Sequence, residues 1–216
     1  YWLAINREWT SIAELQADII PAVAKGKLLE TLEALSFRCL LEQQGTRFTQ
    51  QPVVMEYMTE QILDVSKSEL SQSTLDLLTT HALLKATAKD YIRETQRRLI
   101  VERLCDRLVD RFGSQTTLIK HLQQQFHPLR HSTQPSYGAG NLINLLSHLK
   151  ADFTGSDFSC LTIRQADLRD TPLQQVNLAN ANVFGCVFAD SVTDINNMVL
   201  SPDGEILVMM GLNGTL

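Results

Sequence analysis

The most regular hydrophobic pattern of the chain lies in residues 151–190, where an apolar residue stands at the centre of each of eight consecutive five-residue blocks. Two positions before these centres, most residues are Ala, Ser, Thr or Cys. A period of five fits neither a helix nor an alternating strand. It predicts a solenoid of nearly square cross-section, in which each block forms one side and coils stack at about 4.8 Å. The predicted inward residues are Phe153, Phe158, Ile163, Leu168, Leu173, Leu178, Val183 and Phe188.

The blocks ADFTG, ADLRD, VNLAN and ANVFG resemble the pentapeptide-repeat family, whose blocks read A(D/N)LXX. That resemblance implies a right-handed quadrilateral β-helix of about two coils. Just before it, the apolar run NLINLLSHL predicts a short helix over residues 141–149. A solenoid exposes its apolar interior at each end, so we expect this helix to cap the first coil. The residues expected to point into the coil are Leu142, Leu145, Leu146 and Leu149.

Residues 1–65 show helical and strand patterns in alternation. Ser11 and Glu14 form a capping-box pattern that predicts a helix ending before Pro21, and a second amphipathic helix follows over LLETLEALSFRCL. Residues 40–43 and 47–50 predict a hairpin, after which Pro52 suits the first turn of another helix. Helix, helix, hairpin and helix is the order of a winged helix.

DNA recognition is one function to weigh for a winged helix. A recognition helix needs cations and hydrogen-bonding side chains that face phosphates and base edges. The candidate helix instead carries Glu30 and Glu33 beside Lys27 and Arg38. Direct DNA reading is therefore the weaker interpretation.

The runs YWLAINREWTSIAELQADI and LLETLEALSFRCLLEQQGTRFTQQPVVMEYMTEQIL are similar to the winged-helix segment of bacterial NB-ARC-type (STAND) signalling NTPases that carry WD repeats. In that family the segment packs on the nucleotide-binding module, and the histidine of a Met-His-Asp stretch contacts the nucleotide. The resemblance places Gln50, Gln51 and Pro52 at those three positions. Since proline supplies neither a carboxylate nor an amide proton, the sequence predicts no cofactor site of its own.

Residues 66–140 predict a helical linker or bundle. Ile100, Leu104, Leu108 and Phe112 form one apolar face of a helix that ends at Gly113. A neighbouring row, Arg103, Arg107 and Arg111, alternates with Asp106 and Asp110. It could bind phosphate or an acidic partner, but interleaved acids favour a solvated face with intrahelical pairs. Residues 126–140 contain two prolines and two glycines and read as a loop.

Residues 191–216 leave the five-residue phase and contain two apolar runs around Ser201-Pro202-Asp203-Gly204. This resembles the opening of a WD repeat, in which an SPDG turn joins the first two strands of a blade. The predicted organisation is thus a winged helix (1–65), a helical linker (66–140), a capping helix with coil (141–190) and the start of a WD blade (191–216). The fold class is α+β in several parts.

Composition and the absence of certain motifs argue against enzymatic and metal-binding functions. The chain has 216 residues and a net charge of −5, distributed as −4 over residues 1–65, +5 over 66–150 and −6 over 151–216. It lacks a phosphate loop of the GxxxxGK(S/T) type and a CxxC pair, and its histidines show no metal-binding spacing. We therefore expect no enzyme and no catalytic or metal site. The absence of a membrane span or signal sequence predicts a cytoplasmic protein, and a first residue other than Met predicts a piece of a longer one.

The sequence therefore predicts a non-catalytic regulatory and scaffold segment of a signal-transduction NTPase. Its expected partners are the nucleotide-binding module and WD-repeat propeller of the same parent chain, and other proteins, with neither nucleic acid nor membrane. The alternative is a nucleic-acid-binding winged helix or a DNA-mimicking pentapeptide-repeat protein. Two coils rise only about 10 Å, which is short for mimicry of a duplex. A charge at either of two inward positions, Leu168 or Leu178, should unfold the coil.

Overall fold

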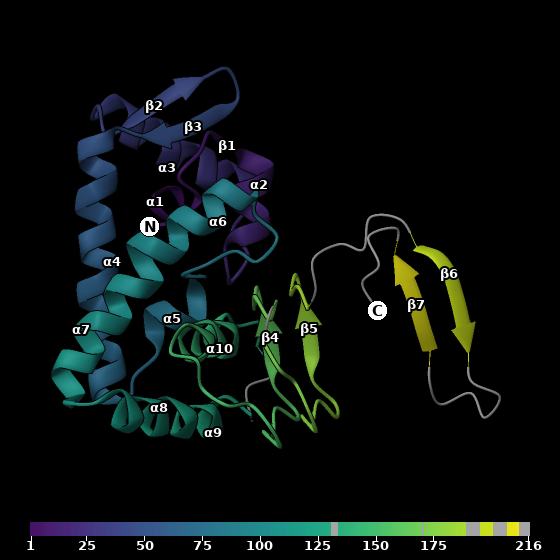
Figure 1. Cartoon of the computed structure of the whole chain (residues 1–216). Helices are drawn as coiled ribbons and strands as arrows, with labels where there is room; N and C mark the ends of the chain where they lie inside the picture. The colour runs from purple at the N-terminus through teal and green to yellow at the C-terminus, as the bar shows by residue number, and fades with distance from the viewer. Residues whose placement is uncertain (131–133, 170, 189–194, 201–206, 212–216) are drawn as a thin grey trace.

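The computed structural model describes residues 1–130, 134–169, 171–188, 195–200 and 207–211. Helices from the first two thirds of the chain gather into one body, and the short parallel strands that follow stand against its last helix (Figure 1). Buried apolar side chains form one continuous cluster that extends from Trp2 to Leu168. The helical body and the first layer of the five-residue blocks therefore share a single core.

The N-terminal unit follows the order helix, strand, helix, helix, strand, strand. Its capping box is confirmed, because the Ser11 hydroxyl accepts from the Glu14 amide at 3.2 Å while the Glu14 carboxylate accepts from the Ser11 amide at 2.6 Å. The hairpin is also confirmed, with Glu42 opposite Thr49. The elements are α1 (Trp2–Asn6), β1 (Thr10–Ser11), α2 (Ile12–Asp18), α3 (Lys25–Phe37), β2 (Leu41–Gln44) and β3 (Arg47–Gln50).

Strand β1 was not predicted from the sequence. It pairs antiparallel with β3, placing Thr10 opposite Phe48, and the sheet order is β1-β3-β2. Two residues are too few to show an alternating pattern, so only the tertiary pairing identifies this strand. Phe48 lies on the central strand β3, and its ring is buried in the core.

Helix α4 (Pro52–Gln72) begins at the expected proline and runs for 21 residues. It ends where Ser73 adopts a left-handed backbone conformation with φ of 57°. The helix therefore passes through residue 65, where the sequence suggested a boundary between two units. Its second half packs against the middle helices instead of ending the N-terminal unit.

The middle of the chain is helical, with one extended rod. Helix α6 continues without a break into the π-helical segment η1 and then into α7, which ends at Gly113 with φ of 77°. The predicted apolar face is confirmed, since Ile100, Leu104 and Leu108 are fully buried. The elements are α5 (Asp76–Thr80), α6 (Asp90–Gln96), η1 (Arg97–Glu102), α7 (Arg103–Phe112) and α8 (Gln115–Gln124).

The predicted loop over residues 126–140 is partly wrong. Helix α9 (Phe126–Leu129) occupies its start, and α10 (Gly138–His148) begins three residues earlier than the expected capping helix. Glycines at helix starts weaken a helical signal in the sequence. The four leucines assigned to the capping helix are all buried, as expected.

In the five-residue blocks, residues twenty apart lie side by side. Strand β4 (Thr162–Arg164) pairs in parallel with β5 (Asn182–Phe184), and two parallel bridges, such as Asp167 with Val187, keep the same offset. Left-handed backbone conformations recur every fifth residue at 155, 160 and 165, and again at 175, 180 and 185. These left-handed residues are the last residues of their five-residue blocks.

Beyond the blocks, β6 (Ile195–Leu200) and β7 (Leu207–Gly211) pair as an antiparallel hairpin. The two predicted apolar runs therefore do form paired strands. The Ser201-Pro202-Asp203-Gly204 turn between them lies outside the described residues.

Candidate functional site

The positions that the resemblance assigns to a nucleotide contact do not form a pocket. Gln51 is exposed and caps α4 without a side-chain hydrogen bond, and Pro52 occupies the first helical position. Gln50 is buried on β3, and its side-chain carbonyl has no hydrogen-bond partner. None of the three lines a described pocket.

The eight predicted inward residues divide into two groups. Phe153, Phe158, Ile163 and Leu168 are 1–4% exposed, and the rings of the two phenylalanines lie 5.7 Å apart. In the second layer, Leu173 is partly buried, while Leu178, Val183 and Phe188 are 36–45% exposed. The first layer is therefore core, and the second layer forms an open end.

Helix α10 approaches strand β4 so closely that one residue must be glycine. A Cβ atom added to Gly140 would lie 1.8 Å from the carbonyl oxygen of Arg164, far inside van der Waals contact. One turn further along the helix, Asn144 donates to the carbonyl of Gln165 at 3.0 Å and accepts from the amide of Asp167 at 2.8 Å. The asparagine thus completes the backbone hydrogen bonding of the first layer.

The same helix is also tied to the helical body. The side-chain oxygen of Asn141 accepts from the Leu83 amide at 2.8 Å, and its nitrogen donates to the carbonyls of Leu78 and His81. Asn141 is almost fully buried, so these bonds replace those that water would make. Helix α10 therefore binds the loops of the helical body on one side and the five-residue blocks on the other.

A buried carboxylate links the blocks to the helical rod. Asp167 forms ion pairs with Arg169 at 2.7 Å, Arg97 at 3.2 Å and Arg93 at 3.4 Å. Arg93 comes from α6 and Arg97 from the π-helical segment η1, whereas Arg169 follows the carboxylate in the same block. Three guanidinium groups around one buried carboxylate compensate its lost hydration.

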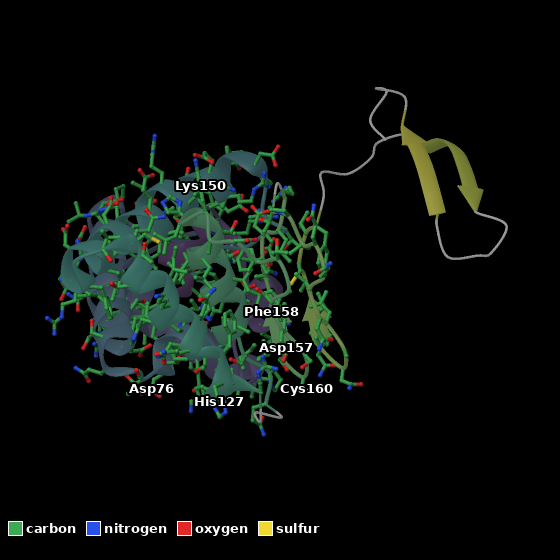
Figure 2. All side chains as sticks on the ribbon, turned by 60° about the horizontal axis from the view of Figure 1, so that its bottom comes forward. Asp76, His127, Lys150, Asp157, Phe158 and Cys160 are labelled. Atoms are coloured by element: carbon green, nitrogen blue, oxygen red, sulfur yellow. The ribbon has the colours of Figure 1, made fainter. Side chains whose placement is uncertain are left out.

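Two further contacts extend this junction. At the end of α9, Arg130 pairs with Asp157 at 2.6 Å and donates to the hydroxyl of Ser159 at 3.1 Å. Figure 2 labels Asp157 on the five-residue blocks and His127 on α9. On the rod side, Arg169 donates to the carbonyl of Ala86 at 3.1 Å. The junction residues are Arg93, Arg97, Arg130, Gly140, Asn141, Asn144, Asp167 and Arg169.

The sequence did not single out these junction residues. A signal was present in α10, where two asparagines and two glycines interrupt an otherwise apolar helix. Polar residues within a buried helix need partners, so they mark a contact. No local pattern links Asp167 with Arg93 and Arg97, since about seventy residues separate them.

The arginine row on α7 makes interhelical pairs. Arg107 binds Asp64 of α4 at 2.8 Å, and both Arg103 and Arg107 bind Glu60. The sequence favoured pairs with Asp106 and Asp110 on the same helix. That expectation is wrong for these two arginines, because α4 lies alongside α7 and offers its own carboxylates.

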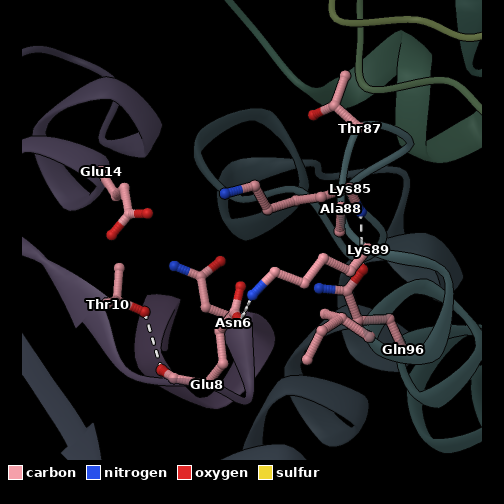
Figure 3. Close-up of a pocket in the computed structure, with 10 residues that line it drawn as sticks. Asn6, Glu8, Thr10, Glu14, Lys85, Thr87, Ala88, Lys89 and Gln96 are labelled. Atoms are coloured by element: carbon pink, nitrogen blue, oxygen red, sulfur yellow. Dashed lines mark hydrogen bonds and ion pairs between the residues drawn. The ribbon is translucent and has the colours of Figure 1, made fainter.

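A polar pocket of about 220 Å³ lies between α1 and the middle helices (Figure 3). Its two cations are already neutralised, since Lys85 pairs with Asp18 and Lys89 pairs with Glu8, each at 2.8 Å. The buried amide of Asn6 donates to Asp18 at 3.2 Å and keeps its oxygen unpartnered. The charges balance, so the pocket shows no preference for an anion.

Two titratable groups, His81 and Cys105, are held in their neutral forms. Burial lowers the pKa of His81, which stacks on Trp2 at 5.1 Å, to about 4. Burial also raises the pKa of Cys105 to about 12, so that thiol is a poor nucleophile. Among the described residues, no three His, Cys, Asp or Glu side chains are grouped to hold a metal ion. Within the same residues, no helix is both long and apolar enough to cross a membrane.

Comparison with known proteins gives one informative relative. The chain is 36% identical, over 242 aligned positions, to an uncharacterized WD repeat-containing protein of Nostoc sp.. The alignment covers 96% of this chain and 19% of that protein, so the chain spans about a fifth of its length. No protein-family description matches the sequence, and no solved structure matches it. The chain is therefore similar to part of a WD repeat-containing protein.

Proposed function

We propose that this chain is a non-catalytic regulatory and scaffold segment of a signal-transduction NTPase of the NB-ARC type. It connects a nucleotide-binding module with a WD-repeat propeller and fixes the orientation of one relative to the other. The observation that carries the proposal is the junction, where buried polar and ionic contacts join the helical body to the five-residue blocks. A segment built to transmit orientation needs such a joint, because a flexible linker would lose the angle between its ends.

Each part of the proposal has its own support. The order of elements in the N-terminal unit and its three-stranded sheet support the winged helix. The pentapeptide-repeat β-helix is supported by the twenty-residue offset between parallel strands and by left-handed residues at the ends of the blocks. The similarity to a WD repeat-containing protein supports a propeller in the parent chain.

Exposed apolar side chains on the N-terminal unit favour a docked neighbour. Phe37 is 91% exposed at the end of α3, and Val53 and Tyr57 are exposed one turn apart on α4. Val53 and Tyr57 lie close in sequence to Gln51 and Pro52, the positions that in the resembling family approach the nucleotide-binding module. A contiguous apolar patch marks a protein contact, whereas single exposed side chains do not, and Val53 and Tyr57 share one face of α4. We propose that the nucleotide-binding module packs here, without a nucleotide contact from Gln51 or Pro52.

Residual dipolar couplings in the 216-residue chain test the proposal. We expect amides of α4, α7, β4 and β5 to fit a single alignment tensor, because the shared core holds them together. Two different tensors would show that the helices and the blocks reorient independently. That result would leave the chain without the rigidity that its proposed role requires.

A low-salt gel-shift titration separates this role from the nucleic-acid alternative. Helix α3 exposes Lys25 and Lys27 together with Glu30 and Glu33, so we expect no tight binding of duplex DNA. Salt-sensitive binding that Lys27→Ala weakens would favour the DNA-binding winged helix instead.

A further inference from the structure

The second layer of the five-residue blocks ends in an uncovered apolar surface. Leu178, Val183 and Phe188 are each more than a third exposed, although the residues twenty positions earlier are nearly fully buried. Among the described residues, nothing covers this surface. We call the side chains of Leu178, Val183 and Phe188 the open end.

An open end of this kind needs a cover. Side chains inside a solenoid are shielded by the layers above and below them, so a terminal layer without a cap leaves its apolar residues in water. The first layer meets this need through α10, which packs on β4. The second layer has no equivalent helix among the described residues.

The chain itself supplies an apolar element at this point. Phe188 is the last described residue of the blocks, and β6 begins at Ile195, so the connecting residues span at most about 25 Å. By sequence, the strands read INNMVL and LVMMG and include three methionines, whose flexible side chains adapt to irregular surfaces. An isolated two-stranded hairpin is only marginally stable in water, so it also needs a surface to pack on.

We propose that the β6–β7 hairpin of the same chain packs on the open end and serves as its cap. The short connection gives the hairpin an effective concentration in the millimolar range, which favours this contact over one between molecules. This inference deepens the proposed function, since it makes the open end the contact through which orientation passes to the segment that follows.

Two adjacent substitutions in β5 provide a matched test. Val183→Asp places a charge in the open end, whereas Asn182→Asp places the same charge on the neighbouring exposed residue, whose side chain points the other way along the strand. Amide hydrogen exchange is measured on the full 216-residue chain, in peptides that cover residues 195–211. We expect protection of these peptides in the unmodified chain and in Asn182→Asp, and exchange about tenfold faster or more in Val183→Asp.

A second variant distinguishes loss of the hairpin contact from general unfolding caused by the charge in Val183→Asp. Phe188→Ser removes a half-exposed ring without adding a charge, and it should also speed exchange in residues 195–211. Amides of β4 and β5 should remain protected in this variant. Light scattering should report a monomer throughout.

Three results would overturn the inference. The first is that the hairpin amides of the unmodified chain exchange without protection. The second is that hairpin exchange is unchanged in both Val183→Asp and Phe188→Ser. The third is that the chain forms a dimer in which the open end stays protected in those two variants. Hairpin amides that exchange freely while β4 and β5 remain protected would refute only the cap. Loss of protection in β4 and β5 of the unmodified chain would instead refute the proposed coil.

Discussion

Gly140 shows how one residue can fix the distance between two elements. The missing Cβ lets α10 approach the Arg164 carbonyl, and the bonds of Asn144 to Gln165 and Asp167 depend on that approach. The contacts of the junction can therefore be tested one residue at a time by substitution.

Gly140→Ala should destabilise the protein by about 1–3 kcal/mol, because the added methyl group forces α10 away from β4. Gly26→Ala is the matched control, since Gly26 also lies in a helix and has open space around its Cβ position. Gly26 is the second residue of α3, where helix propensity counts less than in a helix interior, so that control should stabilise the chain by less than about 0.5 kcal/mol. Chemical denaturation measures both, and equal effects of the two alanines would contradict the close approach.

Asp167→Ala should lower the free energy of unfolding by about 2–3 kcal/mol, since it leaves three arginines without their buried acceptor. Asp152→Ala is the control, because the exposed Asp152 only accepts from the Thr154 amide in its own block. Urea denaturation compares the two variants. A smaller loss for Asp167 than for Asp152 would argue against the ion cluster as a structural link.

His81 should make stability dependent on pH. Its pKa is about 4 in the folded chain, below the ordinary value of 6.5, because burial disfavours the charged ring. The unfolded state therefore binds more protons, and stability should fall as pH drops from about 6.5 towards 4. His81→Phe keeps an aromatic ring beside Trp2 and should reduce this fall in urea midpoints measured at several pH values. An equal decrease of stability with falling pH in both proteins would show that a group other than His81 causes the pH dependence.

At the scale of elements, the five-residue blocks form two layers with different burial. Leu168 and Leu178 both occupy central positions, but only Leu168 is buried by a covering layer. The expectation that a charge at either position would unfold the coil therefore needs revision for Leu178. An aspartate there retains access to water.

Leu168→Asp should cost at least 3 kcal/mol and abolish a folded first layer, since it places an unpaired charge in the core. Leu178→Asp should cost less, about 1–2 kcal/mol, because its carboxylate can remain hydrated. Thermal unfolding followed by circular dichroism measures the difference. Equal losses would show that the two layers are equally closed.

Much of this element structure was predictable from the sequence. The capping box, the hairpin, the start of α4 and the apolar face of α7 all follow from short local patterns. The missed features depend on tertiary contacts. Strand β1 is too short to show a period, α10 begins with glycines that resemble a loop, and α4 continues past residue 65 because the middle helices cover its second half.

The candidate site was predicted less completely than the fold. The inward positions of the first layer follow from the five-residue period, but the exposure of Val183 and Phe188 depends on what covers the last layer. The Asp167 cluster joins residues about seventy positions apart, so no local spacing reveals it. Sequence patterns identify elements more readily than the contacts between them.

Across the whole molecule, we propose that the helical body and the five-residue blocks move as one rigid unit. Three kinds of contact support this claim: the continuous apolar core, the buried amides of α10 and the ion pairs around Asp167. A chain with only one of these could still hinge between its two parts. Together they fix both the distance and the angle.

Native cysteines allow a direct measurement of this rigidity. Cys39 on the N-terminal unit and Cys160 on the blocks are exposed, whereas Cys105 is buried with a raised pKa and should not react. With Cys186 replaced by alanine, spin labels on Cys39 and Cys160 report one distance distribution. We predict a single narrow distribution that Asp167→Ala broadens and Asp152→Ala does not. A broad or multiple distribution in the otherwise unmodified chain would show that the helical body and the blocks move relative to each other.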